Sequence, residues 1–142
     1  MILLDVNILV YAHREDVPDH AKYRDWLERK LHSSEPCGLS DLVLSGCLRI
    51  ITHPKIFIPP TPLNLALQYV RQLREHPNVS MVTPGMMHWK IFTELCEAAN
   101  AKGNLVPDAY HAALAIESGC EWITTDRDFA RFPALKWATP DI

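Results

Sequence analysis

Apolar runs and amphipathic stretches alternate along the chain and predict short buried strands joined by helices. Residues 1–4, 79–82 and 121–125 have the length and composition of buried strands. Between them, apolar residues recur every three or four positions, as they do along one face of a helix. Short strands that alternate with helices predict an α/β fold with a mostly parallel sheet and helices on both of its faces.

Capping and helix-breaking residues set the ends of the predicted helices. Asn7, Asp19 and Ser40 are placed to cap three of them, because their side-chain oxygens can accept a hydrogen bond from the first turn. Pro54 prevents the third helix from continuing, and Lys102-Gly103 is placed as a C-cap for the fifth. The predicted helices cover residues 8–11, 20–32, 41–51, 63–75, 86–101 and 107–119.

Size and composition narrow the class of protein. A chain of 142 residues without a linker or repeat predicts a single domain over residues 1–142. Its four cysteines are scattered, as is typical of reduced thiols in a cytoplasmic protein. No apolar stretch approaches the roughly 20 residues of a membrane span, so we expect no membrane association. Because the net charge is -3, a nucleic-acid substrate would have to meet local positive charge.

Carboxylates follow two predicted strands and begin one helix. Asp5 follows the first strand, whereas Asp126 and Asp128 follow the last. Asp108 lies in the first turn of the alanine-rich helix 107–119. Ligands of open α/β sheets bind at the carboxyl ends of the strands, so these acids could converge there. Each also has a simpler explanation, as a turn residue, a favourable charge at a helix N-terminus, or a helix cap.

Taken together, the acids favour a metal site. Like charges that lie close together repel and raise one another's pKa, so the cluster needs a cation to stay ionised. Mg²⁺, for which Mn²⁺ can substitute, takes a few oxygen ligands, keeps several waters and often binds a substrate phosphate. A metal-activated water at such a site would hydrolyse phosphodiester bonds. Asn7 could orient a ligand or a water without adding charge.

Three segments, spread in order over nearly the whole chain, carry a resemblance to a known family. They are Leu3-Leu4-Asp5-Val6-Asn7, then Asn104-Leu105-Val106-Pro107-Asp108-Ala109 leading into Ala112-Ala113-Leu114-Ala115, and finally Thr124-Thr125-Asp126-Arg127-Asp128-Phe129. The chain resembles PIN-domain proteins of the VapC toxin type. The resemblance implies a PIN-like fold and a Mg²⁺-dependent endoribonuclease, the toxic component of a type II toxin-antitoxin system. It also implies a cognate VapB-like antitoxin and a homodimer.

The resemblance also implies roles for the acids. By position, Asp5 and Asp108 become the principal metal ligands, and Asp126 and Asp128 complete the acidic pocket as further ligands. Asp5, Asp108 and Asp126 become the catalytic residues, and Asn7 supports the pocket.

One position departs from the family pattern. An additional acid usually lies on the helix after Ser40, and Gly46 stands there in this chain. Asp41 lies five positions earlier and would point in another direction at about 3.6 residues per turn. The remaining acids still supply the few protein ligands that Mg²⁺ takes, so we expect activity with looser metal binding.

Two further residues are candidates for substrate contact. His111 follows Asp108 by one helical turn, and the alternative is a histidine hydrogen-bonded in the interior. Arg127 lies between two candidate acids, where it could contact RNA or pair with Asp126 or Asp128. Other cations that could flank an RNA path, with a solvated surface as the default, are Arg14, Arg49, Lys55, Lys102 and Arg131.

Two other functions fit parts of the pattern. A catalytically weak or inactive PIN domain that binds RNA or protein would account for Gly46. A receiver or a phosphatase could use Asp5 as a phosphoacceptor. However, a dehalogenase-like site would have a second aspartate at Asn7, and a receiver would have its acceptor at a later strand and a lysine further on. The endoribonuclease is therefore the favoured hypothesis.

Overall fold

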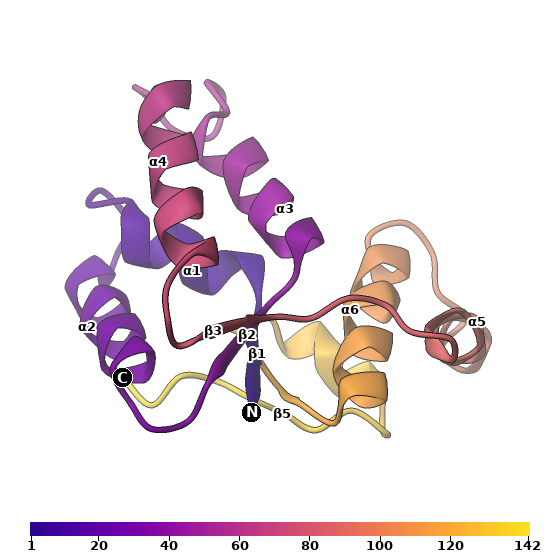
Figure 1. Ribbon diagram of the computed structural model, residues 1–142. Coiled ribbons are helices and arrows are strands. Elements are labelled where there is room, and N and C mark those ends of the chain that lie inside the picture. The colour runs from indigo at the N-terminus through magenta and orange to yellow at the C-terminus, as the bar shows by residue number, and fades with distance from the viewer.

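A five-stranded parallel sheet forms the centre of the computed structural model, which describes residues 1–142 (Figure 1). Its strands are β1 (Ile2–Leu4), β2 (Cys37–Leu39), β3 (Val79–Met81), β4 (Glu121–Ile123) and β5 (Trp137–Ala138). They lie in the order β3-β2-β1-β4-β5, and every neighbouring pair is parallel. The predicted α/β fold is confirmed, with β1 at the centre of the sheet.

Helices cover both faces of this sheet. They are α1 (Val6–His13), α2 (His20–Leu31), α3 (Asp41–Ile51), α4 (Leu63–Arg74), α5 (His88–Ala99), α6 (Leu105–Ser118) and the short 3-10 helix η1 (Arg127–Arg131). Helices α1 and α2 pack together on one side, α3 and α4 extend above them, and α6 lies on the other side with α5 outside it (Figure 1). The chain moves outward from β1 to β3 and then returns past β1 to β4. Because crossovers between parallel strands are right-handed, this reversal of direction places the later helices on the opposite face of the sheet.

Two strands have no counterpart in the sequence prediction. Strand β2 spans three residues and β5 two, which is too short for a periodic pattern to show. In β2, a Cβ on Gly38 would lie 2.9 Å from the Ile2 carbonyl oxygen, so the glycine permits the close approach to β1.

Some helix ends differ from the sequence prediction. The predicted Asn7 cap is wrong, because Asp5 is the N-cap of α1 and accepts a hydrogen bond from the backbone N–H of Val6. The Lys102-Gly103 C-cap is also wrong, since Asn100 ends α5 in the left-handed conformation, at φ 49°. Asp19 stands at the N-cap position of α2 but its side chain makes no capping hydrogen bond. Ser40 caps α3 as predicted.

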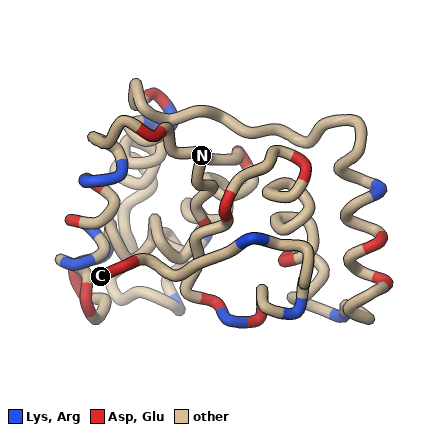
Figure 2. The backbone as a smooth tube through the Cα atoms, turned by 90° about the horizontal axis from the view of Figure 1, so that it is seen from below, with Lys and Arg blue, Asp and Glu red and all other residues tan.

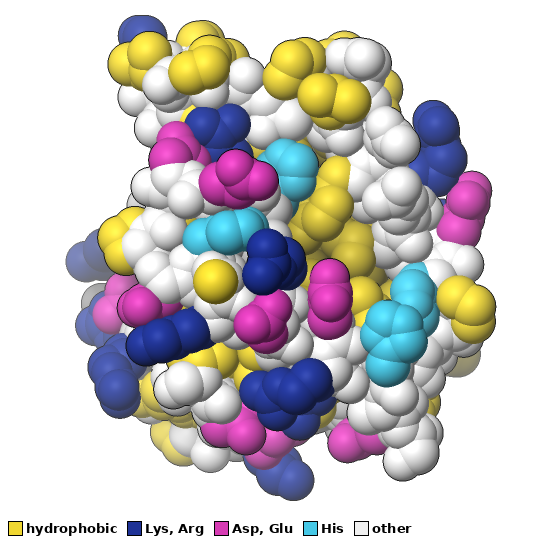
Figure 3. All heavy atoms as spheres, turned by 90° about the vertical axis from the view of Figure 1, so that its left-hand side faces the viewer, with side chains coloured by type: hydrophobic (Ala, Val, Ile, Leu, Met, Phe, Trp, Pro, Cys, Tyr) yellow, Lys and Arg dark blue, Asp and Glu magenta, His cyan; other side chains and the backbone are white.

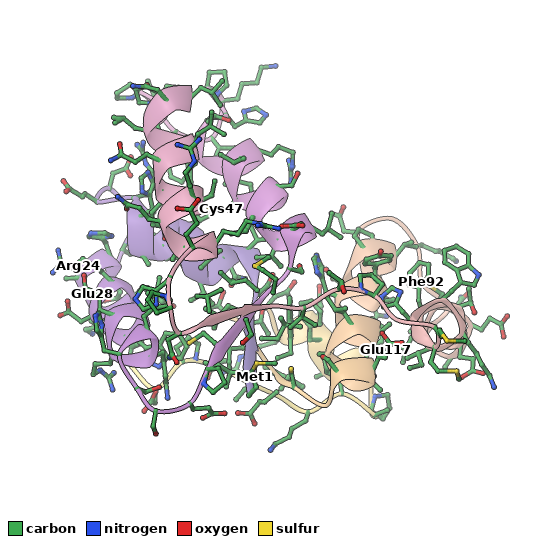
Figure 4. The ribbon with its side chains drawn as sticks, in the orientation of Figure 1. Met1, Arg24, Glu28, Cys47, Phe92 and Glu117 are labelled. Atoms are coloured by element: carbon green, nitrogen blue, oxygen red, sulfur yellow. The ribbon has the colours of Figure 1, made fainter.

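The surface charges are mixed and the cysteines are unpaired, as the composition predicts. Lys and Arg are interspersed with Asp and Glu along the outer elements (Figure 2). All four cysteines are free, and burial raises the pKa of the Cys47 thiol, on α3 (Figure 4), to about 12. No helix combines the length and the apolar run needed to cross a bilayer.

A hollow of about 360 Å³ lies between α2 and α4. Its floor is apolar, with Leu27, Leu31 and Leu73, and charged and histidine side chains surround it (Figure 3). Arg24 and Glu28 border it from α2 (Figure 4).

Candidate active site

The predicted acids meet where the order of the strands reverses. Strands β2 and β3 lie on one side of β1, and β4 and β5 on the other, so the carboxyl ends of β1 and β4 border a crevice. Asp5 follows β1 directly, Asp126 follows β4, and Asp108 reaches in from the first turn of α6. All three line one cleft of about 480 Å³. The structure therefore brings together three of the four predicted acids.

Asp5 is a buried carboxylate with both oxygens engaged. Its Oδ1 accepts a hydrogen bond from the Val6 N–H at 2.6 Å, and its Oδ2 accepts one from the Thr124 hydroxyl at 2.6 Å. Burial raises the pKa of Asp5 to about 6, the two hydrogen bonds oppose this rise, and the charge of Asp126 adds to it. Asp5 therefore titrates close to neutral pH.

Thr124 connects two of the acids. Its side chain is fully buried, and its Oγ1 accepts a hydrogen bond from the backbone N–H of Asp126 at 2.9 Å while donating to Asp5. The oxygen Oδ1 of Asp126 accepts a hydrogen bond from the backbone N–H of Asp128 and so caps η1. The helix-cap explanation of Asp126 is thus correct, and the same residue also lines the cleft. Sequence reasoning missed Thr124, although it stands in the quoted segment that ends at Phe129.

Burial and repulsion by the other acids both raise the pKa of Asp108. Burial and, after it, the charges of Asp126, Asp5 and Asp128 together raise its pKa to about 6. Burial has the larger effect, so the repulsion expected from the sequence is present but secondary. Asp128 is exposed and does not line the cleft.

Two polar side chains of the cleft have atoms that lack a partner. Both Asn7 Oδ1 and His111 Nδ1 are buried without a hydrogen bond. The His111 ring stacks against Trp122, with ring centroids 5.3 Å apart, and burial lowers its pKa to about 4. His111 is therefore neutral at pH 7. Its Nδ1 makes no hydrogen bond, whereas the alternative to a substrate contact was a histidine hydrogen-bonded in the interior.

The wall of the cleft formed by α3 carries a glycine and an arginine instead of acids. A Cβ on Gly46 would lie 3.0 Å from Val6 Cγ2, so a side chain there would crowd α1. Arg49 is exposed, forms no ion pair, and is the one Lys or Arg that lines the cleft. Arg127 lies outside the cleft and is exposed, and it does not pair with Asp126 or Asp128.

The donor atoms fit a hard divalent cation in type. The cleft offers the carboxylate oxygens of Asp5, Asp108 and Asp126, together with the unpartnered Asn7 Oδ1. However, no three His, Cys, Asp or Glu side chains are already arranged to hold a metal ion. Each Asp5 oxygen accepts one hydrogen bond and keeps a second lone pair, so Asp5 could still bind an ion together with the less buried Asp108 and Asp126.

Comparison with known proteins identifies the class. The PIN-domain family matches residues 2–135, and the chain belongs to that family. Ribonuclease VapC43 of Mycobacterium tuberculosis is 44% identical over 140 residues, which cover 99% of this chain and 95% of that protein. Within the PIN family, the relatives of this chain are thus VapC proteins.

Solved structures show the same fold. The VapBC2 structure from Rickettsia felis, bound to a promoter DNA fragment, matches with a TM-score of 0.73 and 20% identity, covering 99% of this chain and 100% of that one. A toxin-antitoxin complex from Klebsiella pneumoniae matches with a TM-score of 0.55 and 20% identity, covering 95% of each chain. At these identities the similarity concerns the fold alone.

Proposed function

We propose that this protein is a Mg²⁺-dependent endoribonuclease that acts in the cytoplasm as the toxic component of a type II toxin-antitoxin pair. The observation that carries the proposal is the convergence of Asp5, Asp108 and Asp126 in one cleft at the reversal of strand order. The match to Ribonuclease VapC43 over nearly the full length of both chains supports it.

The acids would hold Mg²⁺, or Mn²⁺ in its place. Asp5, Asp108 and Asp126 are the proposed ligands, with Asn7 beside them and Asp128 at the rim. When bound, the ion supplies an activated water and neutralises charge that develops on the phosphodiester. Thr124 fixes the Asp5 carboxylate and the Asp126 backbone relative to each other, so the site is partly organised in advance.

Arg49 supplies the local positive charge that an acidic protein needs to bind RNA. Arg49 lines the cleft on the α3 side, and its guanidinium has no protein carboxylate as a partner. A guanidinium presents its N–H donors in a fork that matches phosphate oxygens. Arg49, one of the cations that the sequence offers beside an RNA path, therefore orients the backbone of the substrate.

A VapB-like antitoxin is the proposed partner. The similarity in fold to a solved toxin-antitoxin complex supports it. The apolar hollow between α2 and α4 is suited to an apolar segment of such a partner. We further propose a homodimer, since apolar side chains such as Ile58 and Leu63, 84% and 62% exposed, stand at the outer end of α3 and α4.

Purified protein incubated with structured RNA tests the nuclease proposal. Cleavage is expected with Mg²⁺ or Mn²⁺, and EDTA abolishes it. Asp108→Asn is expected to lower the rate at least about 100-fold, whereas Asp25→Asn, an exposed acid on α2, leaves it unchanged. Equal cleavage by Asp108→Asn would contradict the proposal. Tight RNA binding without cleavage in any metal would favour an inactive binding module, the second candidate, which Gly46 at the position of an acid supports.

A further inference from the structure

The acidic cleft continues beyond His111 into a second, smaller hollow. Leu42 and His111 line both spaces and form the partition between them. The second space has a volume of about 230 Å³. Its other lining residues include Ser40, Val82, Thr83, Pro84, Tyr110 and Leu114, and we call it the β3 hollow because three of them follow strand β3.

We propose that the β3 hollow binds one nucleobase of the RNA, next to the phosphodiester bond that is cut. This inference rests on the proposed ribonuclease function and adds a substrate subsite to it. A nucleotide whose phosphate lies among Asp5, Asp108 and Arg49 must place its neighbouring base somewhere along the cleft walls. The β3 hollow is the concave space on the other side of Leu42 and His111, the two residues that it shares with those walls.

The lining and size of the β3 hollow suit a flat, uncharged ring. Val82, Pro84 and Leu114 provide apolar surface, and Tyr110 contributes an aromatic ring. Pockets for drug-sized ligands begin at about 300 Å³, so this smaller space fits one ring system. The Asp41 carboxylate at its edge already pairs with Arg74, the Arg74 Nε lying 2.9 Å from Asp41 Oδ1, so no unpaired charge there attracts a phosphate or a cation.

The walls of the β3 hollow are fixed in advance. The Glu117 carboxylate (Figure 4) accepts hydrogen bonds from the Gly85 and Met87 N–H groups at 2.6 and 2.9 Å, which holds the loop after Pro84 in place. The Tyr110 ring contacts Phe92, labelled between α5 and α6 in Figure 4, with centroids 5.4 Å apart. A base entering the hollow therefore has few side chains to order.

Polar groups at the partition offer partners for the edge of a base. His111 is nine-tenths buried, and its Nδ1 has no partner within the chain. The Ser40 Oγ accepts a hydrogen bond from the Val43 N–H, which leaves its own hydroxyl hydrogen free to donate. Bases present ring nitrogens, carbonyl oxygens and amines along their edges, so these groups could favour one base over another.

Cleavage of a randomised RNA pool tests the inference. Sequencing the new ends should show that one position beside the cut prefers a particular base by about fivefold, the factor that one net hydrogen bond of about 1 kcal/mol supplies. Thr83→Phe, a change at an exposed position outside the catalytic set, fills the β3 hollow and should reduce that preference to less than about twofold while cleavage continues. Thr139→Phe, at another exposed threonine, should leave the preference intact. Tyr110→Leu provides a second variant that removes the ring and keeps an apolar side chain.

A photo-crosslink separates this inference from the nuclease proposal. RNA that carries 5-iodouridine is bound to Asp108→Asn and irradiated, and we expect crosslinks at Tyr110 or within residues 82–84. Such crosslinks without any wild-type cleavage would refute the nuclease and leave the base site standing. Cleavage with an unchanged base preference in Thr83→Phe and Tyr110→Leu would refute the base site. That result is also the one expected if the hollow binds a side chain of a partner protein instead of a base.

Discussion

The buried Asp5 carboxylate should make the stability of the metal-free protein depend on pH. Its pKa rises from 3.8 to about 6, and at about 1.4 kcal/mol per pKa unit this corresponds to at most about 3 kcal/mol. The folded state binds the proton more tightly than the unfolded state does. The free energy of unfolding that Asp5 contributes is therefore highest below pH 4 and is lost as the pH rises through 6.

His111 acts in the opposite direction over nearly the same pH range. Burial lowers its pKa from 6.5 to about 4, so its contribution is present above pH 6.5 and is lost as the pH falls toward 4. Asp108, whose pKa is also raised to about 6, acts in the same direction as Asp5, and the effect of His111 partly cancels that of the two acids in the wild type. Substitution of one residue at a time should therefore reveal them. The free energy of unfolding of Asp5→Asn should rise with pH relative to wild type, and that of His111→Gln should fall.

Urea unfolding in EDTA, at several pH values between 4 and 7.5, measures this difference. The side-chain amide in Asp5→Asn keeps an oxygen for the Val6 N–H but loses the hydrogen bond from Thr124, which costs about 1 kcal/mol at every pH. Between pH 4 and 7.5, the Asp5→Asn curve should therefore gain about 2 to 3 kcal/mol on wild type. In a second series without EDTA, Mg²⁺ at ten times its Kd should stabilise the wild type by about 1.4 kcal/mol and this variant less. Parallel pH curves would refute the reasoning.

The remaining predictions concern the walls of the cleft. In steady-state kinetics, Arg49→Ala should raise KM for RNA about tenfold with kcat nearly unchanged, and Arg49→Lys should recover part of that loss. The control variant Arg131→Ala changes an exposed cation outside the cleft and should have no effect on KM. Thr124→Val should destabilise the fold by about 1 to 3 kcal/mol in thermal or urea unfolding, because it leaves Asp5 Oδ2 and the Asp126 N–H unpaired. Gly46→Glu should tighten Mn²⁺ binding in calorimetry while raising KM for RNA, and Val6→Ala in the same chain should relieve the crowding. Unchanged metal affinity in the double variant would contradict the last prediction.

The parts of the site that are local in sequence were predictable. The strands that precede Asp5 and Asp126 are apolar runs that end abruptly in acid, and Asp108 stands beside a proline that tolerates a first turn. A parallel sheet brings strand ends to one edge, which accounts for Asp5 and Asp126, and the N-terminus of α6, the helix that leads into β4, brings Asp108 to the same edge. The sequence alone could not show whether Asn7 or Asp5 caps α1, because both residues have a suitable side chain. The N-cap depends on the residue at which β1 ends.

The parts that depend on packing between distant segments were not predictable. Thr124 acts through Asp5, more than 100 residues earlier, which becomes visible once β1 and β4 are paired. Arg49 lines the cleft and Arg127 does not, which depends on how α3 lies against α1, and the partition depends on where α3 and α6 place Leu42 and His111. Side-chain type indicated these residues as candidates, but it carried no information about which of them face the cleft.

The glycine at position 46 is consistent with a working nuclease when its neighbour one turn away is considered. A glutamate there would lie at i, i+3 to Arg49, the spacing at which opposite charges pair on a helix. Such a pair would occupy the one guanidinium that lines the cleft. With Gly46, Arg49 stays free to bind phosphate, and the cleft carries three carboxylates instead of four, which weakens its repulsion of a polyanion. On the proposed function, we expect Gly46 to lower metal affinity and to raise substrate affinity, and the Gly46→Glu variant tests both effects.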